Sequence, residues 1–595
     1  MAQSIIKKAE NPVTFSIFSD GEKVKSTNGL ISIWIRKEIN KIGKVTLEIE
    51  SRNLPQNEII ESNKDTFLPG KKIRIDAGYQ GNETCLFEGI VSTHHLVILE
   101  DGTSLKIECR DFAFPMSLTR QNRKFNDKSD KEMMAEILKS YPGLKPKITD
   151  TQIKHQEMLQ CYCTDWDFLL SRADSCGLLV ITEKDKIKIK APNTKEKAIY
   201  SIRYGVDLVE FNGELQAANQ VENIEAIGWD PAKQELLTAT SSVPSLNKQG
   251  NVSSSKLATA INGGTKVLNM SNCSDIKKLQ SWADAQGVKI ALSRIQGNIK
   301  CIGNPFIQPD SIVEIEGFGD RFNGNVYVGA VEHQFESTQW TTKIEMGVPC
   351  SNITENQQVE APSASGYLPG IKGLHIGKVL KLAGDPSREN RIQVNIPTLN
   401  IKEGFVWARL LQISASQEYG TFFIPNLEDE VVVGFFNNDP CQAVILGSLY
   451  SSKLKPPYPF TSNNSKKAIV TTSKIKLEFD DEKKTISLIT PGKNTMVIDD
   501  DSESITLHDQ HNNELCLNQD GITMKSAKDI ILKAQRNITI ECMSKTSIKA
   551  TQDAILEGMN VNIEAKMGVT VKGSTTAELS ASGQTTVKGA MVMIN

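Results

Sequence analysis

The C-terminal part of this sequence lacks aromatic residues and proline. No Phe, Tyr or Trp follows Phe479, and no proline follows Pro491, although the chain continues to Asn595. Aromatic rings supply much of the buried area of an ordinary domain, so an ordered segment without them has to enclose a narrow interior of small aliphatic groups. The absence therefore excludes a conventional globular domain in this part of the chain.

Other scarcities concern all 595 residues. The 68 Lys and Arg nearly balance the 71 Asp and Glu, so no basic excess indicates a nucleic-acid partner. No run of 18 apolar residues occurs, and the opening MAQSIIKKAENP lacks the apolar core of a signal peptide, so we expect a protein made in the cytoplasm. The 11 scattered cysteines lack zinc-site spacing and are expected to be reduced core residues. We therefore expect no metal and no cofactor.

The segment that lacks aromatic residues contains a repeating pattern of aliphatic residues. From Ile522 onward, triplets of alternate residues recur every eight residues, with one seven-residue step into Val561. The middle residue of each triplet is aliphatic, and the third is Ser, Ala, Cys or Gly. We predict that the middle residues form the interior column of a needle: Met524, Leu532, Ile540, Ile548, Leu556, Ile563, Val571, Leu579 and Val587.

The repeat indicates short strands that each bury one face, with the small residues where backbones crowd. Three such faces close a triangular prism, which one chain could wind alone or three chains could wind together. Three intertwined chains give a longer buried column without lateral strand edges. The pattern therefore favours an intertwined trimeric β-helix over 522–595, with single-chain winding as the alternative.

The sequence before the repeat divides into further regions. Residues 371–455 contain strand-like runs such as RIQVNIP, GTFFIP and EVVVGFF, broken by turn residues, and are predicted to form a small closed β-barrel. A Ser- and Pro-containing linker, 357–370, precedes this barrel, and a neck with β-hairpins, 456–521, follows it. The fold class is therefore mainly β.

Residues 1–356 are predicted to form a hub of two β-barrel domains with a few helices. A capping box of Ser129 and Glu132 indicates the start of one helix. The expected helices run from Ser129 to Tyr141, from Thr164 to Gly177 and from Ser274 to Gly287. Between them, Lys186, Lys188 and Lys190 alternate with isoleucine, which we interpret as charges that guard a strand edge.

Searches for catalytic motifs find no HExxH, no GxSxG and no Walker loop. His508 and His511 flank Asp509 and could share a metal on a threefold axis, although a solvated turn is the alternative. The acidic run of residues 499–501 lacks the spacing of a calcium loop and is interpreted as a hairpin tip. The sequence therefore predicts no catalytic site.

Three regions carry a resemblance to a known family. The run IPNLEDEVVVGFFNNDPCQAVILGSLY, followed by KPPY, resembles the oligonucleotide/oligosaccharide-binding-like (OB-like) domain of VgrG (valine-glycine repeat) proteins. Val571-x-Gly573 and Val587-x-Gly589 match the repeat of their needle, and DWDFLLSRADSCGLLVI resembles a segment of their hub. The chain is therefore similar to VgrG spike proteins of type VI secretion systems, which resemble the hub and needle of contractile phage tails.

The resemblance implies a structural, non-enzymatic spike that punctures a membrane. In that family a homotrimeric hub meets a hexameric Hcp-type tube and baseplate components, a PAAR-type protein caps the tip, and sheath contraction delivers the assembly outside the cell or into a target cell. No toxin domain follows the repeat here, so we expect separate effector proteins. The terminal GAMVMIN exposes an apolar end, and we predict that Met591, Val592, Met593 and Ile594 dock the tip protein.

Two alternatives stay open. The same spike could belong to a phage tail or an extracellular contractile particle. A trimeric β-helix could also be a glycan-cleaving tailspike or an adhesin, with paired carboxylates on its flank. The candidate flank residues are Glu541, Asp553, Glu557 and Glu564, and they are interspersed with lysines as on a mixed solvated surface.

Overall fold

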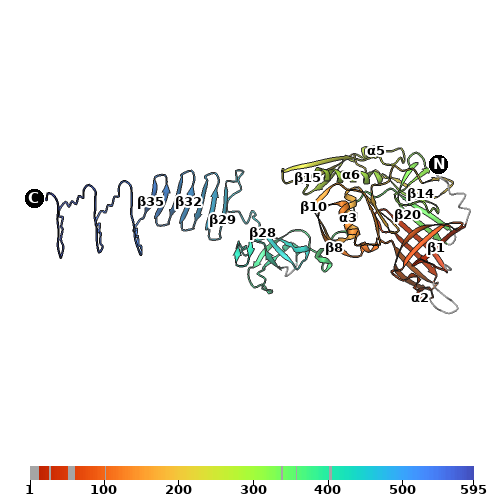
Figure 1. Cartoon of the computed structure of the whole chain (residues 1–595), viewed down its shortest axis with the longest axis horizontal. Helices are drawn as coiled ribbons and strands as arrows, with labels where there is room; N and C mark the ends of the chain where they lie inside the picture. The colour runs from red at the N-terminus through yellow and green to blue at the C-terminus, as the bar shows by residue number, and fades with distance from the viewer. Residues whose placement is uncertain are drawn as a thin grey trace. The chain divides into compact units, whose positions relative to one another are not determined.

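The computed structural model describes residues 12–25, 29–50, 60–100, 102–336, 339–356, 358–400 and 405–594. The chain divides into two compact units, Met1–Leu449 and Tyr450–Asn595. Figure 1 shows strands throughout the first unit, whereas the second unit begins with strands and continues as a trace without them. Of the opening stretch MAQSIIKKAENP, for which we expect no signal peptide, only Pro12 is among the described residues. Asn595 also lies outside them. No helix of the described residues is both long and apolar enough to cross a membrane.

One sheet of thirteen strands dominates the first unit. Its main path runs β14-β18-β21-β20-β3-β4-β7-β6-β5-β1-β2, and β19 joins β13 to β20. The strands are β1 (Val13–Ser19), β2 (Glu22–Lys23), β3 (Leu30–Glu38), β4 (Lys44–Glu50), β5 (Lys72–Tyr79), β6 (Asn82–Leu99), β7 (Gly102–Arg110), β13 (Tyr200–Arg203), β14 (Leu208–Leu215), β18 (Ile295–Ile302), β19 (Ile312–Glu316), β20 (Gly324–Glu336) and β21 (Gln339–Met346). A short helix, α2 (Ile60–Asn63), precedes β5.

Two apolar cores lie on this sheet. One gathers Ile33, Ile35, Val45 and Leu47 with other side chains from β1 to β7. The second gathers side chains such as Ile299, Val326 and Ile344 from β13 and β18 to β21. The sheet is continuous across both cores, and the division of the hub into two barrels stays a prediction, as do the boundaries 1–356, 357–370, 371–455, 456–521 and 522–595.

Helices α3 (Asp130–Leu138) and α4 (Asp165–Ser175) share a further core with small sheets. Ser129 and Glu132 form the predicted capping box, and the Thr164 side chain caps α4, so both predicted helix starts are confirmed. The small sheets pair β8 (Arg120–Ser129) with β10 (Lys154–Thr164), and β9 (Lys145–Ile148) and β11 (Leu179–Glu183) with β12 (Lys186–Lys190).

Strand β12 corrects one interpretation. It is the central strand of its sheet, with β11 antiparallel on one side and β9 parallel on the other. Lys188 forms an ion pair with Glu183, and Lys190 Nζ lies 2.6 Å from Asp310 Oδ2. Because β12 has a neighbour on each side, its lysines guard no strand edge. Lys188 and Lys190 instead neutralise carboxylates.

Helix α6 (Ile276–Leu292) corrects a second prediction, because it continues beyond Gly287. A Cβ atom at Gly287 would lie 3.1 Å from the Ser242 carbonyl oxygen and 3.3 Å from Pro244 Cδ. Glycine therefore permits a close approach inside the helix and does not end it. The helix packs on a sheet of β15 (Asn223–Asp230), β16 (Glu235–Ser242) and β17 (Thr265–Met270), and the short helix α5 (Ser254–Ala260) was not expected.

Five strands close the small barrel that the sequence predicts. They are β22 (His375–Lys381), β23 (Ile392–Asn395), β24 (Phe405–Leu410), β27 (Glu430–Phe435) and β28 (Ala443–Ser448), and they enclose a core of mainly valine and isoleucine side chains. The run GTFFIP forms no barrel strand: only its first residue belongs to the hairpin of β25 (Ala415–Ser416) and β26 (Tyr419–Gly420). Phe422 and Phe423 in this run are exposed.

The second unit begins with an antiparallel sheet of seven short strands in sequential order, which we call the ladder. Its strands are β29 (Lys466–Val470), β30 (Lys476–Asp480), β31 (Thr485–Ile489), β32 (Thr495–Asp499), β33 (Ser504–His508), β34 (Glu514–Asn518) and β35 (Gly521–Lys525). The acidic run forms the turn between β32 and β33, where Asp499 Oδ1 accepts bonds from the Asp501 and Ser502 amides, which confirms the hairpin tip.

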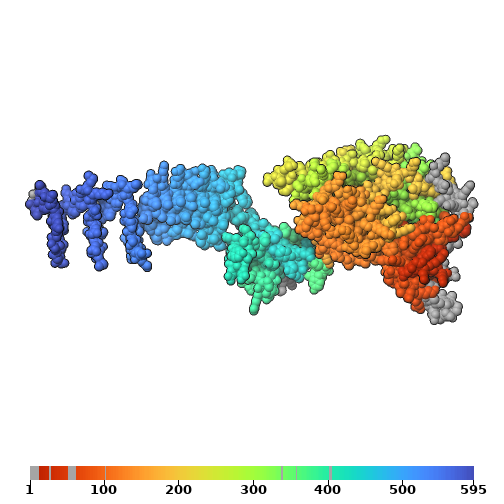
Figure 2. Space-filling model, viewed as in Figure 1, coloured from red at the N-terminus to blue at the C-terminus, as the bar shows by residue number. Residues whose placement is uncertain are grey.

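The described residues after β35 contain no regular helix or strand. Figure 2 shows this segment as a narrow chain with separate projecting loops. The intertwined β-helix predicted for 522–595 therefore stays a prediction. All 11 cysteines are free; Cys161, Cys441 and Cys542 are exposed, so they are not the core residues that we expected.

Candidate functional site

The ladder carries two apolar columns on one face. Each strand from β30 to β35 places two apolar residues two positions apart, and the strand register aligns them with those of the next strand. One column is Ile469, Leu477, Leu488, Met496, Leu507, Leu515 and Met524, and the other is Phe479, Ile486, Ile498, Ile505, Leu517 and Ile522. The columns therefore reach the first predicted needle triplet.

No layer formed by the described residues of the second unit covers this face. In β31, Ile486 and Leu488 are exposed, whereas Ser487 between them is half-buried. Strand β33 shows the same pattern: the apolar Ile505 and Leu507 are exposed, whereas the polar Thr506 between them is half-buried. A sheet with one apolar face normally packs that face on a core. Among the described residues after Ile445, however, no apolar side chain is buried.

The opposite face of the ladder is polar, and Tyr458 packs at its start. The Tyr458 hydroxyl donates to Glu478, and the Lys466 and Lys476 ammonium groups lie 5.3 and 5.5 Å from the centre of its ring. Hydrogen bonds from Tyr458 and Lys466 lower the pKa of Glu478. The chain therefore covers part of the polar face while it leaves the apolar face open.

A hydrogen-bonded turn fixes the chain where it leaves the ladder. Asp509 accepts bonds from the Asn513 backbone and side-chain nitrogens, both at 2.8 Å, and these bonds help to lower the pKa of Asp509. Asn513 Oδ1 in turn accepts from the Ser526 hydroxyl at 2.8 Å and from the Ala527 amide at 3.2 Å. The turn after β33 therefore sets the direction in which the chain leaves β35.

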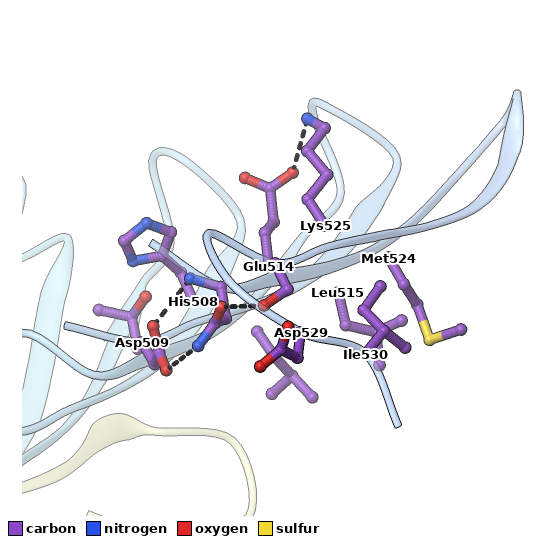
Figure 3. Close-up of a pocket in the computed structure, with 12 residues that line it drawn as sticks. His508, Asp509, Glu514, Leu515, Met524, Lys525, Asp529 and Ile530 are labelled. Carbon is purple, nitrogen blue, oxygen red and sulfur yellow. Dashed lines mark hydrogen bonds and ion pairs between the residues drawn. The ribbon is translucent and has the colours of Figure 1, made fainter. Parts of the chain in front are cut away.

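A cavity of about 430 Å³ lies beside this turn. Figure 3 shows His508 and Asp509 at one end and Leu515, Met524 and Ile530 at the other. Lys525 Nζ lies 3.2 Å from Glu514 Oε1 near its rim. The cavity therefore joins the end of an apolar column to the first residues beyond the ladder.

All the predicted needle-column residues are exposed in the single chain. Their exposed fractions range from 56% for Met524 to 84% for Ile548, and only Met524 lies in a strand. The predicted docking residues Met591, Val592, Met593 and Ile594 are exposed as well. The structure thus places these side chains on an uncovered surface, and their roles stay predictions.

The ladder columns before Ile522 were missed in the sequence. The available signal was the pair of alternate apolar residues in KLEFD, TISLI, TMVID, SITLH and ELCLN. These pairs follow one another at unequal intervals, because the turns between the strands differ in length. A regular period of eight residues is therefore visible only from Ile522 onward, after most of the ladder strands.

Other candidates contribute less to this site. His508 lines the cavity and His511 lies in the neighbouring turn, and no group of three or more metal-ligating side chains occurs in the described parts of the chain. Glu541, Asp553, Glu557 and Glu564 are exposed on the segment after β35. Within that described segment none of these four carboxylates forms an ion pair.

These features define a class: a modular, predominantly β protein in which a strand-rich N-terminal region and a small closed barrel precede a strand ladder with one exposed apolar face. Residues 9–337 match the family described as the Alg8 N-terminal domain. This match covers more than half of the chain, so the chain belongs to that family. Residues 375–450 match the type VI secretion system/phage-baseplate injector OB domain, which comprises the five-stranded barrel.

Curated relatives match short parts of the chain. The chain is 29% identical to the actin cross-linking toxin VgrG1 of Vibrio cholerae over 110 residues, which are 17% of this chain and 10% of the relative. It is 34% identical to the type VI secretion system spike protein VgrG5 of Pseudomonas aeruginosa over 67 residues, 11% of this chain and 8% of the relative. The matches thus span about a tenth of the length of these relatives. The chain is VgrG-like.

Among solved structures, one that superposes on part of this chain is the tail protein from Neisseria meningitidis. It is 11% identical, the superposition covers 56% of this chain and 96% of that protein, and the TM-score is 0.44.

Proposed function

We propose that this chain is a structural, non-enzymatic spike of a contractile injection machine of the type VI secretion class, and that it works as a homotrimer. The observation that carries the proposal is the uncovered apolar face of the ladder. Burying one Leu or Ile side chain contributes about 1.5 to 3 kcal/mol, so a double column open to water is unfavourable in a single chain.

Two further copies of the same chain are the simplest cover for that face. Identical strands from three chains can bring their columns to one axis, where each copy buries the apolar faces of the others. The exposed middle residues of the segment after β35 would continue the same column. In this proposal, Met524 lies where the ladder passes into the needle interior, and the cavity beside it receives an aliphatic side chain of a neighbouring copy.

The oligomeric state tests the proposal directly. Light scattering of the purified full chain is expected to give three times the 65.6 kDa of one chain, independent of concentration in the micromolar range. A monodisperse monomer would contradict the trimer and would favour winding of the repeat within one chain.

The spike proposal also assigns its two ends. The hub would face a hexameric Hcp-type tube and baseplate components, and Met591 to Ile594 would dock a PAAR-type tip protein, with effectors carried as separate molecules. The support for the tip is local: four consecutive apolar side chains are exposed there, two of them methionines, whose flexible thioethers adapt to partner surfaces.

A pair of methionine variants tests the tip assignment. Changing Met591 and Met593 to Ser is expected to abolish co-purification of the PAAR-type protein while the trimer persists. Met543→Ser with Met567→Ser is the matched control, because these residues are at least as exposed but lie outside the terminal segment. If the control pair loses the tip protein and the terminal pair retains it, the docking surface lies elsewhere.

A further inference from the structure

A cavity in the hub has the composition of an anion site. It holds about 430 Å³ and is lined by residues 243–255, which form the loop between β16 and α5 and the first turn of α5. Ala291 of α6 and Arg294, which follows the C-cap of that helix, complete the lining. Neither the loop nor the other lining residues include an Asp or Glu, whereas Lys248 and Arg294 both contribute positive charge. The remaining polar lining consists of Ser, Asn and Gln side chains, which can all donate hydrogen bonds.

Arg294 is the central group of this cavity. The residue is 9% exposed, and its guanidinium donates to the Val252 carbonyl at 2.5 Å and to the Gln249 carbonyl at 2.8 Å. No carboxylate of the described residues forms an ion pair with it, and burial alone lowers its pKa. A buried charge is costly unless an opposite charge neutralises it. Two carbonyls satisfy some of its five N–H donors but leave its charge without a partner.

The loop around the guanidinium is held in place by the start of β20 and by the residue that precedes it. The Gly250 amide donates to the Asn323 carbonyl at 2.8 Å, and the Asn325 amide donates to the Lys248 carbonyl at 2.8 Å. Asn247 Nδ2 donates to the Asn325 carbonyl at 2.6 Å. Gly250 has a φ of +63°, and a Cβ atom there would overlap the Arg321 carbonyl oxygen. The cavity is therefore preformed, which lowers the entropic cost of binding.

We propose that this cavity binds a small anionic molecule whose phosphate or carboxylate group pairs with Arg294 and Lys248. A guanidinium presents a planar fork that matches the oxygens of both groups. The cavity volume lies in the range of small-molecule sites and exceeds the space that one ordered water needs. The ligand would stabilise the hub by neutralising a charge that the fold leaves unpaired.

Titration calorimetry on the full chain, with inorganic phosphate and with acetate at constant ionic strength, tests the proposal. Saturable binding of one anion per chain is expected. Phosphate binding without acetate binding would identify a phosphate ligand, and the reverse result a carboxylate ligand. No saturable heat with either anion up to about 10 mM would overturn the proposal, since weaker sites are non-specific.

Two lysine variants make the test specific. Lys248→Glu is expected to weaken binding roughly tenfold or more, because it places a repulsive charge in the cavity. Lys256→Glu changes the net charge equally but lies outside the lining, so its affinity should stay within about twofold of the wild type. Equal weakening by both variants would overturn the proposal. Arg294→Gln should bind neither anion if it folds, and retained binding by a folded variant would also overturn it.

Discussion

The hub and the ladder use the same local sequence pattern with opposite outcomes. In β4 of the hub, Val45 and Leu47 alternate with polar residues and are fully buried. In β33 of the ladder, Ile505 and Leu507 alternate in the same way, yet they are 38% and 40% exposed. Alternation specifies a strand with one apolar face, but it does not specify what covers that face. The hub covers its face with its own strands, whereas the apolar face of the ladder is left exposed by the described residues of the second unit.

A charge placed on the exposed apolar face of the ladder should have the greatest effect on assembly. Leu507→Asp is expected to abolish the trimer, because each copy loses about 1.5 to 3 kcal/mol of burial and three unpaired carboxylates approach one axis at a further cost. Light scattering would report the loss, while the tryptophan fluorescence of the hub should not change.

Thr506→Asp is the matched control for that variant. Thr506 is adjacent in sequence but lies on the polar face of β33, so the same charge should be tolerated there. A trimer that survives Leu507→Asp but dissociates with Thr506→Asp would show that the two faces have been assigned the wrong way round.

Lowering the pH should reduce the free energy of unfolding of the hub, through a buried histidine that has no counterpart among the exposed turns of the ladder. His333 is buried in β20, and burial, reinforced by the nearby Lys37 charge, lowers its pKa from 6.5 to about 3. The unfolded chain therefore binds a proton that the folded hub does not, between pH 6.5 and about 3. Hub stability should be unaffected by this group above pH 6.5 and should fall by roughly 1.4 kcal/mol per pH unit below it.

Urea unfolding followed by tryptophan fluorescence measures this slope in the first unit alone, because all 6 tryptophans precede Leu449. His333→Gln should remove most of the acid-dependent loss, since glutamine cannot be protonated. His511→Gln, in an exposed turn of the ladder, should leave the slope unchanged. A wild-type hub with equal stability at pH 6.5 and pH 4.5 would contradict the prediction for His333.

Short sequence motifs predicted the structure correctly where the stabilising contacts join residues that are close in sequence. Ser129 and Thr164 each cap a helix through bonds to residues three positions away, so short motifs predict both helix starts. The turns of the small barrel are visible for the same reason. The uncovered ladder face, by contrast, could be described from sequence only as alternating apolar residues.

Non-local contacts explain the errors. Strand β12 is central because β9, from an earlier part of the chain, pairs with it in parallel, and no alternation pattern reveals that partner. Gly287 lies inside α6 because the Ser242 carbonyl oxygen and Pro244 approach it from another element. The unpaired charge of Arg294 could not be recognised from sequence either, since it depends on which side chains the fold leaves out of its surroundings.

The smallest expected effect concerns the close internal packing of the hub, which the ladder lacks. A Cβ atom at Gly303 would overlap the Trp340 ring, and the ring cannot withdraw because it stacks on Tyr79 with centres 5.4 Å apart. The Gly303 amide donates to the Trp340 carbonyl at 2.9 Å, and the Tyr79 hydroxyl donates to the Gly303 carbonyl at 2.9 Å, so the backbone is held as well.

Gly303→Ala should therefore lower the free energy of unfolding of the hub by about 1 to 3 kcal/mol, as overpacking does, and leave the trimer mass unchanged. Gly143→Ala is the control, because a Cβ atom there meets open space, and it should change the stability by less than about 0.5 kcal/mol. Urea unfolding monitored by tryptophan fluorescence gives both values. Equal stability of the two variants would mean that Trp340 can move after all, and that the hub packs as loosely at this point as an uncovered surface.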